Sequence, residues 1–229
     1  MFNNYPKTIM QGILSGLIVA TVIMPLDVFA DPTVAPSVLG RTMGEWSAKW
    51  WQWVLEAPAS SNPTLDTTGE FCNDGQRGNV WFLAGVFGGG TAERNCNIPR
   101  GKYILFPLTN AFWINSVWDD PNNTEADYRK LANDNLPQPI GSDLEATLDG
   151  SPVIFNPKTP IIRAQSPVFT ATFPTDNLFG VESSGLTGFP IVSDGFWVIL
   201  PPLTPGAHVL HFRAGQAQDI TYHLTVAEH

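Results

Sequence analysis

The end of the chain carries two runs in which apolar and polar residues alternate. The runs are 208–213 and 220–226, and a short polar segment separates them. Successive side chains of a β-strand point to opposite faces, so this alternation predicts two strands, each with one buried face and one wet face. We expect these strands to form a hairpin; if Arg213 lies opposite Asp219 in it, His211 lies opposite Thr221. The chain must therefore build a sheet that covers a core on one side.

Further strand-like runs precede this hairpin, and segments rich in glycine and proline separate them. Asp149-Gly150 is the strongest turn signal, since this dipeptide suits the positive φ angles of a two-residue hairpin loop. The expected strands are 80–87, 102–108, 144–148, 152–155, 161–164, 168–173 and 196–200. We predict a mainly β protein, an antiparallel β-sandwich with two short helices and a disulfide-bridged N-terminal extension.

The two helices are recognised by their first turns. Each begins with the spacing of a capping box, formed by Thr42 with Glu45 and by Thr124 with Asp127. The first helix should end near residue 56, before Pro58, and the second near residue 133.

Tryptophans mark one face of the first helix. Trp46, Trp50 and Trp53 recur at helical spacing, and large aromatic side chains of this kind usually pack in a core. We expect them to bury against a sheet, with a sugar-stacking platform or a membrane-surface contact as the functional alternative. Trp51 points away from this face and is predicted to be an exposed ring.

Cys72 and Cys96 are the only cysteines in the chain. A bridge between them would close a loop of about 25 residues, for which the chain-entropy model gives roughly 3 kcal/mol of stabilisation. A redox-active or metal-binding pair is the alternative, but it favours closer spacing such as C-x-x-C. We predict a structural disulfide, which requires an oxidising compartment.

The N-terminus has the pattern of an export signal. Lys7 precedes an apolar stretch over 9–24, and the small residues Val28 and Ala30 suit a cleavage site before Asp31. A retained membrane anchor is the alternative, although the apolar run is short for a bilayer span. We predict a signal peptide over 1–30, a helical and disulfide-bridged region over 31–139 and a β-sandwich region over 140–229, or one domain over 31–229.

Three strings of sequence carry a family resemblance. The segment 200–208 (LPPLTPGAH), followed by strand, turn and strand, resembles the closing hairpin of immunoglobulin-like β-sandwiches in exported bacterial proteins. With 46–53 (WSAKWWQW) and 78–85 (GNVWFLAG), the chain is similar to a family of uncharacterised secreted bacterial proteins. The resemblance implies a fold and a periplasmic or extracellular location, and it transfers no catalytic residue.

Composition excludes several classes of protein. The net charge is −9 and no basic run occurs, which argues against a nucleic-acid partner. Charged residues make up 14% and aromatic residues 11%, so the chain has ample apolar surface to fold. A processed chain would carry no stable membrane span.

Two groups of residues are candidate ligand sites. Trp51, Trp113 and Trp118 are the tryptophans whose exposure would indicate a sugar-binding surface. Asp119, Asp120 and Asn122 supply the hard oxygen ligands that calcium prefers, although no EF-hand pattern is present. The alternative for this acidic segment is a polar turn that caps the second helix. No other cofactor is expected.

No catalytic residue can be assigned from the sequence. Neither a nucleophile elbow nor a zinc-protease motif occurs. The function expected is an exported, non-catalytic binding or structural module, for a glycan or a cell-surface partner. The alternative is a secreted carbohydrate-active enzyme with paired carboxylates. The carboxylates near the tryptophans are Glu45, Asp66, Glu70 and Asp74.

Overall fold

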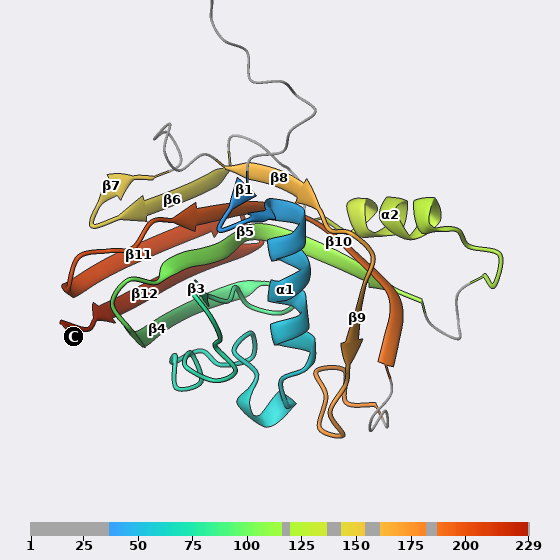
Figure 1. Cartoon of the computed structure of the whole chain (residues 1–229), viewed down its shortest axis with the longest axis horizontal. Coiled ribbons are helices and arrows are strands. Elements are labelled where there is room, and N and C mark those ends of the chain that lie inside the picture. The colour runs from blue at the N-terminus through green and yellow to red at the C-terminus, as the bar shows by residue number, and fades with distance from the viewer. Residues whose placement is uncertain (1–36, 116–119, 137–142, 154–160, 182–186, 229) are drawn as a thin grey trace, which may run out of the picture. The chain divides into compact units, whose positions relative to one another are not determined.

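The computed structural model describes residues 37–115, 120–136, 143–153, 161–181 and 187–228. Within these ranges the protein is mainly β with two α-helices (Figure 1). The elements in chain order are β1 (Ser37–Val38), β2 (Arg41–Thr42), α1 (Met43–Leu55), a 3-10 turn (Ala59–Ser61), β3 (Val80–Phe82), β4 (Gly90–Ile98), β5 (Tyr103–Ile114), α2 (Glu125–Asp134), β6 (Leu144–Leu148), β7 (Ser151–Pro152), β8 (Ile162–Gln165), β9 (Phe169–Thr172), β10 (Thr187–Leu200), β11 (Gly206–Ala214) and β12 (Gln218–Val226).

Most strands form two five-stranded sheets. The first sheet has the order β3-β5-β10-β8, with β9 also paired to β10, and the second has the order β4-β12-β11-β6-β7. Both sheets are mixed, because β3 runs parallel to β5 and β4 runs parallel to β12. In Figure 1 the green β4 lies beside the dark red β12. The prediction of a wholly antiparallel sandwich is therefore wrong, since alternation within a run does not show which distant strand becomes its neighbour.

The predicted terminal hairpin is confirmed. β11 pairs antiparallel with β12, and Arg213 lies opposite Asp219. The Asp149-Gly150 turn also joins two paired strands, β6 and β7. Asp149 has a φ of 52° and Gly150 a φ of 76°, the positive values that this turn needs.

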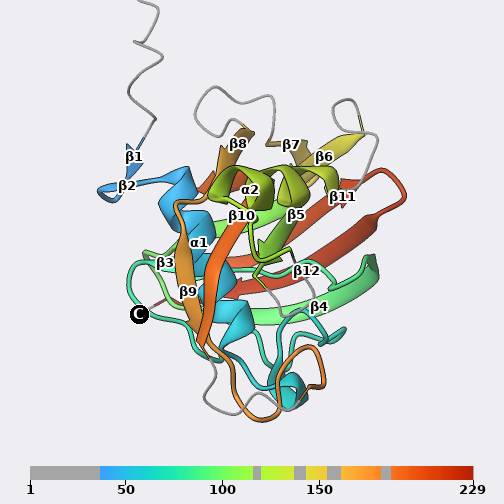
Figure 2. The ribbon, with the colours of Figure 1, turned by 90° about the vertical axis from the view of Figure 1, so that its right-hand side faces the viewer.

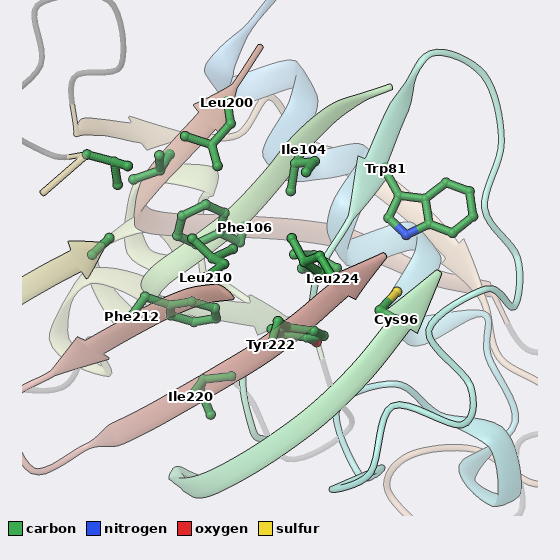
Figure 3. Packing of buried hydrophobic residues seen from close by; sticks show 14 of the residues in the cluster. Trp81, Cys96, Ile104, Phe106, Leu200, Leu210, Phe212, Ile220, Tyr222 and Leu224 are labelled. Carbon is green, nitrogen blue, oxygen red and sulfur yellow. The ribbon is translucent and has the colours of Figure 1, made fainter. Parts of the chain in front are cut away.

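The two sheets face each other across an apolar core (Figure 3). The first sheet contributes Ile104, Phe106 and Leu200, and the second contributes Phe212 and Leu224 among others. Phe106 and Phe212 meet with ring centroids 4.7 Å apart. The alternating runs of the sequence thus bury their apolar faces between the sheets, as predicted.

Helix α1 covers the other face of the first sheet. Figure 2 shows α1 at the left and the strands β12 and β4 of the second sheet at the right. Trp50 and Trp53 are buried against the sheet, which confirms the expectation for that helix face. Trp51 is only 4% exposed, so the prediction of an exposed ring there is wrong. Its ring packs on Phe112 of β5, with centroids 4.4 Å apart.

Both helices start as predicted. Thr42 and Glu45 form a complete capping box at α1, and Thr124 and Asp127 form one at α2. Helix α2 packs on β10 through Tyr128 and other side chains.

The disulfide between Cys72 and Cys96 is present, with Cα atoms 5.8 Å apart. The prediction that it belongs to an N-terminal extension is wrong. Cys96 lies in β4 of the second sheet, and both cysteines pack in the core between the sheets. Each sheet combines strands from 31–139 with strands from 140–229. The bridge therefore fastens the loop before β3 to an edge of the second sheet.

Candidate functional site

A cavity of about 550 Å³ lies where strand β5 extends beyond the end of its neighbour β3. Strand β3 pairs with β5 only over Tyr103–Leu105, and beyond that point no described strand pairs with this edge of β5. We call this space the edge cavity. Its lining comprises Trp50, Trp51, Thr64, Gly85, Val86, Phe87, Gly88, Gly89, Thr109, Asn110, Ala111, Phe112, Trp113, Asn135, Ala217 and Gln218. The volume falls within the range of small-molecule sites.

The cavity is lined by side chains from both faces of β5. Phe112 packs on Trp51 of α1, whereas the next residue, Trp113, packs in the cluster of α2 and Val192. Asn110 shares the face of Phe112, because the two are separated by one residue of the strand. Opposite Asn110 stands Gly195, where a Cβ atom would approach the Asn110 Cβ to 2.7 Å. The sheet thus leaves room for Asn110 only because its partner is glycine.

Three residues of the lining carry buried N–H groups with no acceptor among the described residues. They are the Nε1 atoms of Trp51 and Trp113 and the Nδ2 atom of Asn110. The other tryptophans of α1 differ, since the indoles of Trp46, Trp50 and Trp53 donate to backbone carbonyls at 2.8 to 3.0 Å.

A buried donor without an acceptor destabilises the folded protein by about 1–3 kcal/mol. Three such donors in residues around one cavity are therefore unusual. Trp81 and Trp197 also have unpartnered indole N–H groups, but they do not line the cavity. The three donor atoms of the lining residues have no accessible surface, so they lie behind the surface that a ligand in the edge cavity would contact.

A glycine-rich loop forms one wall of the cavity. A Cβ at Gly85 would lie 2.2 Å from Gln218 Oε1, and a Cβ at Gly89 would lie 2.4 Å from the Ala217 carbonyl oxygen. Gln218 joins the loop to β5, because it accepts from Val86 N–H at 3.4 Å and donates through Nε2 to the Leu108 carbonyl. The glycine-rich loop is therefore held against the start of β12, and larger side chains at Gly85 and Gly89 would clash with it.

Exposed aromatic rings extend from the cavity. Phe87, in the lining, is 39% exposed, and Phe179 is 37% exposed. Their centroids are 6.3 Å apart, and Phe179 also lies 6.1 Å from Phe112. A path of aromatic rings therefore leads from the surface to Trp51, and it offers an apolar contact to an entering ligand.

Among the residues that the structure describes, the cavity lining includes no ionisable side chain. General acid–base catalysis needs a positioned titratable group, and carboxylate-dependent glycoside cleavage needs two. The described part of the lining therefore offers aromatic and amide contacts for binding.

The carboxylates named from the sequence lie elsewhere. Glu45 accepts from Thr42 in the capping box, and these hydrogen bonds lower its pKa. Burial alone would raise the pKa of Asp66, but hydrogen bonds from Phe71, Thr68 and Gly69 lower it. Both carboxylates thus hold local structure in their ionised form.

A shallow groove of about 820 Å³ beside α1 contains Trp46, Trp53, Glu56 and Asp74. Asp74 is the only predicted carboxylate in it, and Glu56 joins it there. Both residues are exposed to solvent, whereas the acid of a glycosidase lies in a desolvated pocket. Glu70 is exposed as well.

The other predicted ligand residues fall into two sets. Trp51 and Trp113 both line the edge cavity, although neither was predicted to sit in a cavity with the other. Trp118 and Asp119 lie outside the described residues. Asp120 accepts two hydrogen bonds from Asn122 at 2.9 Å, at a turn before α2. In the part of the chain that the structure describes, no three His, Cys, Asp or Glu residues gather as a metal site.

Several residues of the cavity were not recognised from the sequence. Asn110, Phe112 and Gln218 fall outside the predicted strands 102–108 and 220–226, because β5 and β12 extend beyond those ranges. One signal was present, because Asn110 is a polar residue within the apolar run of β5.

Comparison with known proteins gives no family. No protein-family model matches the chain, and no curated protein matches it. Among the described residues, neither helix has the length and apolar character needed to cross a bilayer.

Proposed function

We propose that the protein is an exported, non-catalytic binding module whose ligand occupies the edge cavity. The observation that carries this proposal is a cavity lined by the aromatic rings of Trp51, Phe112 and Trp113, in which the described residues include polar amide side chains and no ionisable group. Sugars offer hydroxyl and carbonyl acceptors together with apolar ring faces that stack on aromatic side chains. A glycan, free or on a cell surface, is the ligand class that we favour.

Two features support an exported location. The Cys72–Cys96 disulfide is of the kind that persists in oxidising compartments, and residues 1–30 have the pattern of a cleaved signal. The similarity to secreted bacterial proteins with an immunoglobulin-like C-terminal part belongs to the same proposal. Two facing sheets agree with a sandwich, whereas the parallel pairing of β4 with β12 departs from the antibody-type arrangement.

A glycan array and fluorescence titration test the binding function. The full chain, produced with its signal and recovered after export, is applied to the array, and positive sugars are titrated against tryptophan emission. Trp51→Phe replaces the indole of the lining with a smaller aromatic ring, so it should weaken binding about tenfold through the loss of stacking area.

Trp46→Phe is the matched control, because Trp46 lies on the same helix outside the cavity lining. It should leave the affinity unchanged. Equal affinities for the Trp51→Phe variant and the unmodified protein would contradict the assignment of the cavity. Turnover of a bound glycan that depends on Asp74 or Glu56 would instead support the enzyme alternative.

A further inference from the structure

Strand β5 contains a β-bulge at Leu108. Phe196 of β10 pairs with Thr109, but the next residue of β10 pairs with Pro107. Leu108 therefore has no partner in β10. A bulge places one extra residue in a strand and changes the alternation of its side chains and main-chain groups. The segment of β5 that lines the edge cavity begins directly after it.

Before the bulge, odd-numbered residues of β5 direct their main-chain groups to the β3 side. Tyr103 N–H donates to the Asn79 carbonyl at 3.0 Å. The Leu105 carbonyl accepts from Leu83 N–H at 2.9 Å. Because Leu108 is an extra residue, this role passes to the even-numbered residues beyond it.

Beyond the bulge, the main-chain groups of Asn110 and Phe112 face the open edge. In an antiparallel pair, every second residue exchanges N–H and C=O bonds with the partner strand, and the residues between them face the other way. Asn115 N–H donates to a carbonyl of β10 at 3.1 Å, so Trp113 and Ala111 also face β10. Asn110 and Phe112 alternate with these residues and direct their N–H and C=O groups away from β10. The described residues on that side provide no hydrogen-bond partner for them.

The opposite side of β10 shows the same alternation. Ser193 faces β8, because its carbonyl accepts from Ser166 N–H at 2.9 Å. Its neighbour Val192 therefore faces β5, where its partner is Trp113. Two hydrogen bonds on different sides of β10 thus assign the same direction to the main chain of β5.

The edge cavity follows this open edge. Five consecutive residues of β5, 109–113, line it, although consecutive side chains point to opposite faces of a sheet. A cavity that contacts all of them lies beside the strand rather than above one face. One end is closed by Gln218, whose Nε2 donates to the Leu108 carbonyl. The cavity is therefore a slot in the plane of the first sheet.

We propose that the ligand of the edge cavity is a glycan attached to an extended peptide, and that this peptide adds to β5 as a further strand. The open edge presents N–H and C=O groups at the spacing of a β-ladder, which an extended peptide backbone matches residue by residue. A sugar alone has no such repeat. This inference rests on the proposed binding function and narrows its ligand to a peptide-linked glycan.

Aromatic rings at the entrance of the cavity provide a place for the sugar. Side chains of an added strand alternate between the two faces of the sheet. The exposed ring of Phe179 lies 6.1 Å from Phe112 and 6.3 Å from the exposed ring of Phe87. A glycosylated side chain on the Phe112 face therefore brings its sugar to rings on which it stacks, while the peptide occupies the slot.

Three probes test this ligand class by calorimetry on the full exported chain. The first is the methyl glycoside of the monosaccharide that binds most tightly on the glycan array. The second is the neutral peptide acetyl-Val-Thr-Val-amide, and the third is the same peptide with that sugar on its threonine. The glycopeptide should bind about tenfold more tightly than the methyl glycoside, as expected for two added hydrogen bonds. Equal affinities would overturn the proposal.

N-methylation of the glycopeptide identifies strand addition. The N–H groups of an extended peptide point alternately to its two sides, and only one side faces β5. Methylation of the threonine nitrogen and methylation of the following valine nitrogen therefore give a matched pair. One isomer should fall to the affinity of the methyl glycoside, and the other should keep the affinity of the glycopeptide. Two isomers of equal affinity would contradict strand addition.

Asn110→Pro tests the same contact from the protein side. It removes an N–H group that does not bond to β10, and proline is tolerated at such positions of edge strands. The ratio of glycopeptide affinity to methyl glycoside affinity should fall several-fold. Asn110→Ala is the matched control, because it changes the side chain and keeps the N–H group, so this ratio should be retained. If Asn110→Pro does not fold, judged by circular dichroism, the two methylated isomers decide.

The outcomes separate the two proposals. A methyl glycoside that binds, loses affinity in Trp51→Phe and equals the glycopeptide would retain the binding function and refute the peptide. A peptide without sugar that binds as tightly as the glycopeptide would overturn this proposal and the glycan ligand of the proposed function. If no arrayed glycan binds, both proposals fail.

Discussion

Two buried charges show two ways of keeping an ionised group inside this protein. Asp194 of β10 is 1% exposed and accepts from Arg163, Gln165 and Asn133 at 3.0 to 3.3 Å, so its charge is balanced by a neighbouring cation. Arg94 is equally buried, but its described partners are carbonyls and a hydroxyl. In the first arrangement the carboxylate is paired with a guanidinium, and its hydrogen bonds join β10 to β8 and α2. The second satisfies the guanidinium with neutral acceptors, while the carboxylate of Asp66, whose carbonyl accepts from Arg94, is held by backbone N–H groups.

Replacing Arg94 should give the largest loss of stability. Arg94→Met removes the described donors of the Asp66 and Gly85 carbonyls, whereas the Ala84 carbonyl and the Tyr222 hydroxyl keep each other and Ala84 N–H as partners. Each abandoned acceptor costs about 1–3 kcal/mol. We expect the free energy of unfolding to fall by about 3–5 kcal/mol in urea denaturation, since part of the site can relax. Arg94→Lys keeps the charge without the planar fork and should recover only part of that loss. Unchanged stability of Arg94→Met would mean that the carbonyls find other donors.

Removing the disulfide tests whether the surroundings of Arg94 depend on the covalent link. Cys96 lies two residues after Arg94 in β4, so the bridge fastens the strand that carries the charge. The Cys72→Ser, Cys96→Ser double variant should lose roughly 3 kcal/mol, the value for a loop of this length. Thermal unfolding with and without reductant gives the measurement. A reductant effect that persists in the double variant would show that the loss has another cause.

Neutralising Asp194 should cost less than removing Arg94. We expect about 1–3 kcal/mol for Asp194→Asn, because the Arg163 side chain is 46% exposed and regains water. Burial alone would raise the pKa of Asp194, but the hydrogen bonds from Arg163, Gln165 and Asn133 lower it. A lowered pKa means that the stabilisation is present above the ordinary Asp value of about 3.9 and is lost as the pH falls.

The melting temperature between pH 3 and 6 measures this contribution. The unmodified protein should lose stability more steeply toward acid than Asp194→Asn. Parallel curves would show that Asp194 does not supply the acid-sensitive part of the stability.

Local pattern predicted much of the fold, and long-range pairing accounts for the rest. The capping boxes at Thr42 and Thr124 and the register at Arg213 follow from residues close in sequence or on one hairpin. The parallel neighbour of β12 is β4, more than a hundred residues earlier, and no periodic pattern encodes that choice.

The same limit applies to the edge cavity. Trp51 and Trp113 were selected as rings that could meet a ligand, but the reason given was exposure, and Trp51 is buried. Their common position arises because β3 ends at Phe82 while β5 continues to Ile114, which leaves an edge of β5 uncovered. Strand length relative to a distant partner is a property of the sheet and cannot be read from either run alone.

The pair of His208 and Asp149 should give the smallest effect, because the Asp149 side chain is 49% exposed, and it serves as the reference for both buried charges. His208 Nδ1 lies 2.7 Å from Asp149 Oδ2, and Nε2 lies 2.9 Å from the Thr204 carbonyl oxygen, so the protonated ring can donate at both nitrogens. The hydrogen bond to Asp149 raises the pKa of His208. The stabilisation is therefore complete below the ordinary histidine value of about 6.5 and is lost as the pH rises through the higher value of the folded protein.

For a pair near the surface we expect a loss of less than about 1 kcal/mol between pH 6 and 9, reduced further by salt. His208→Gln should flatten this part of the stability curve, and Asp149→Asn should do the same because it removes the acceptor carboxylate. If His208→Gln keeps the slope, the alkaline loss comes from another group. A loss as large as that of Arg94→Met would mean that burial does not distinguish the three charges.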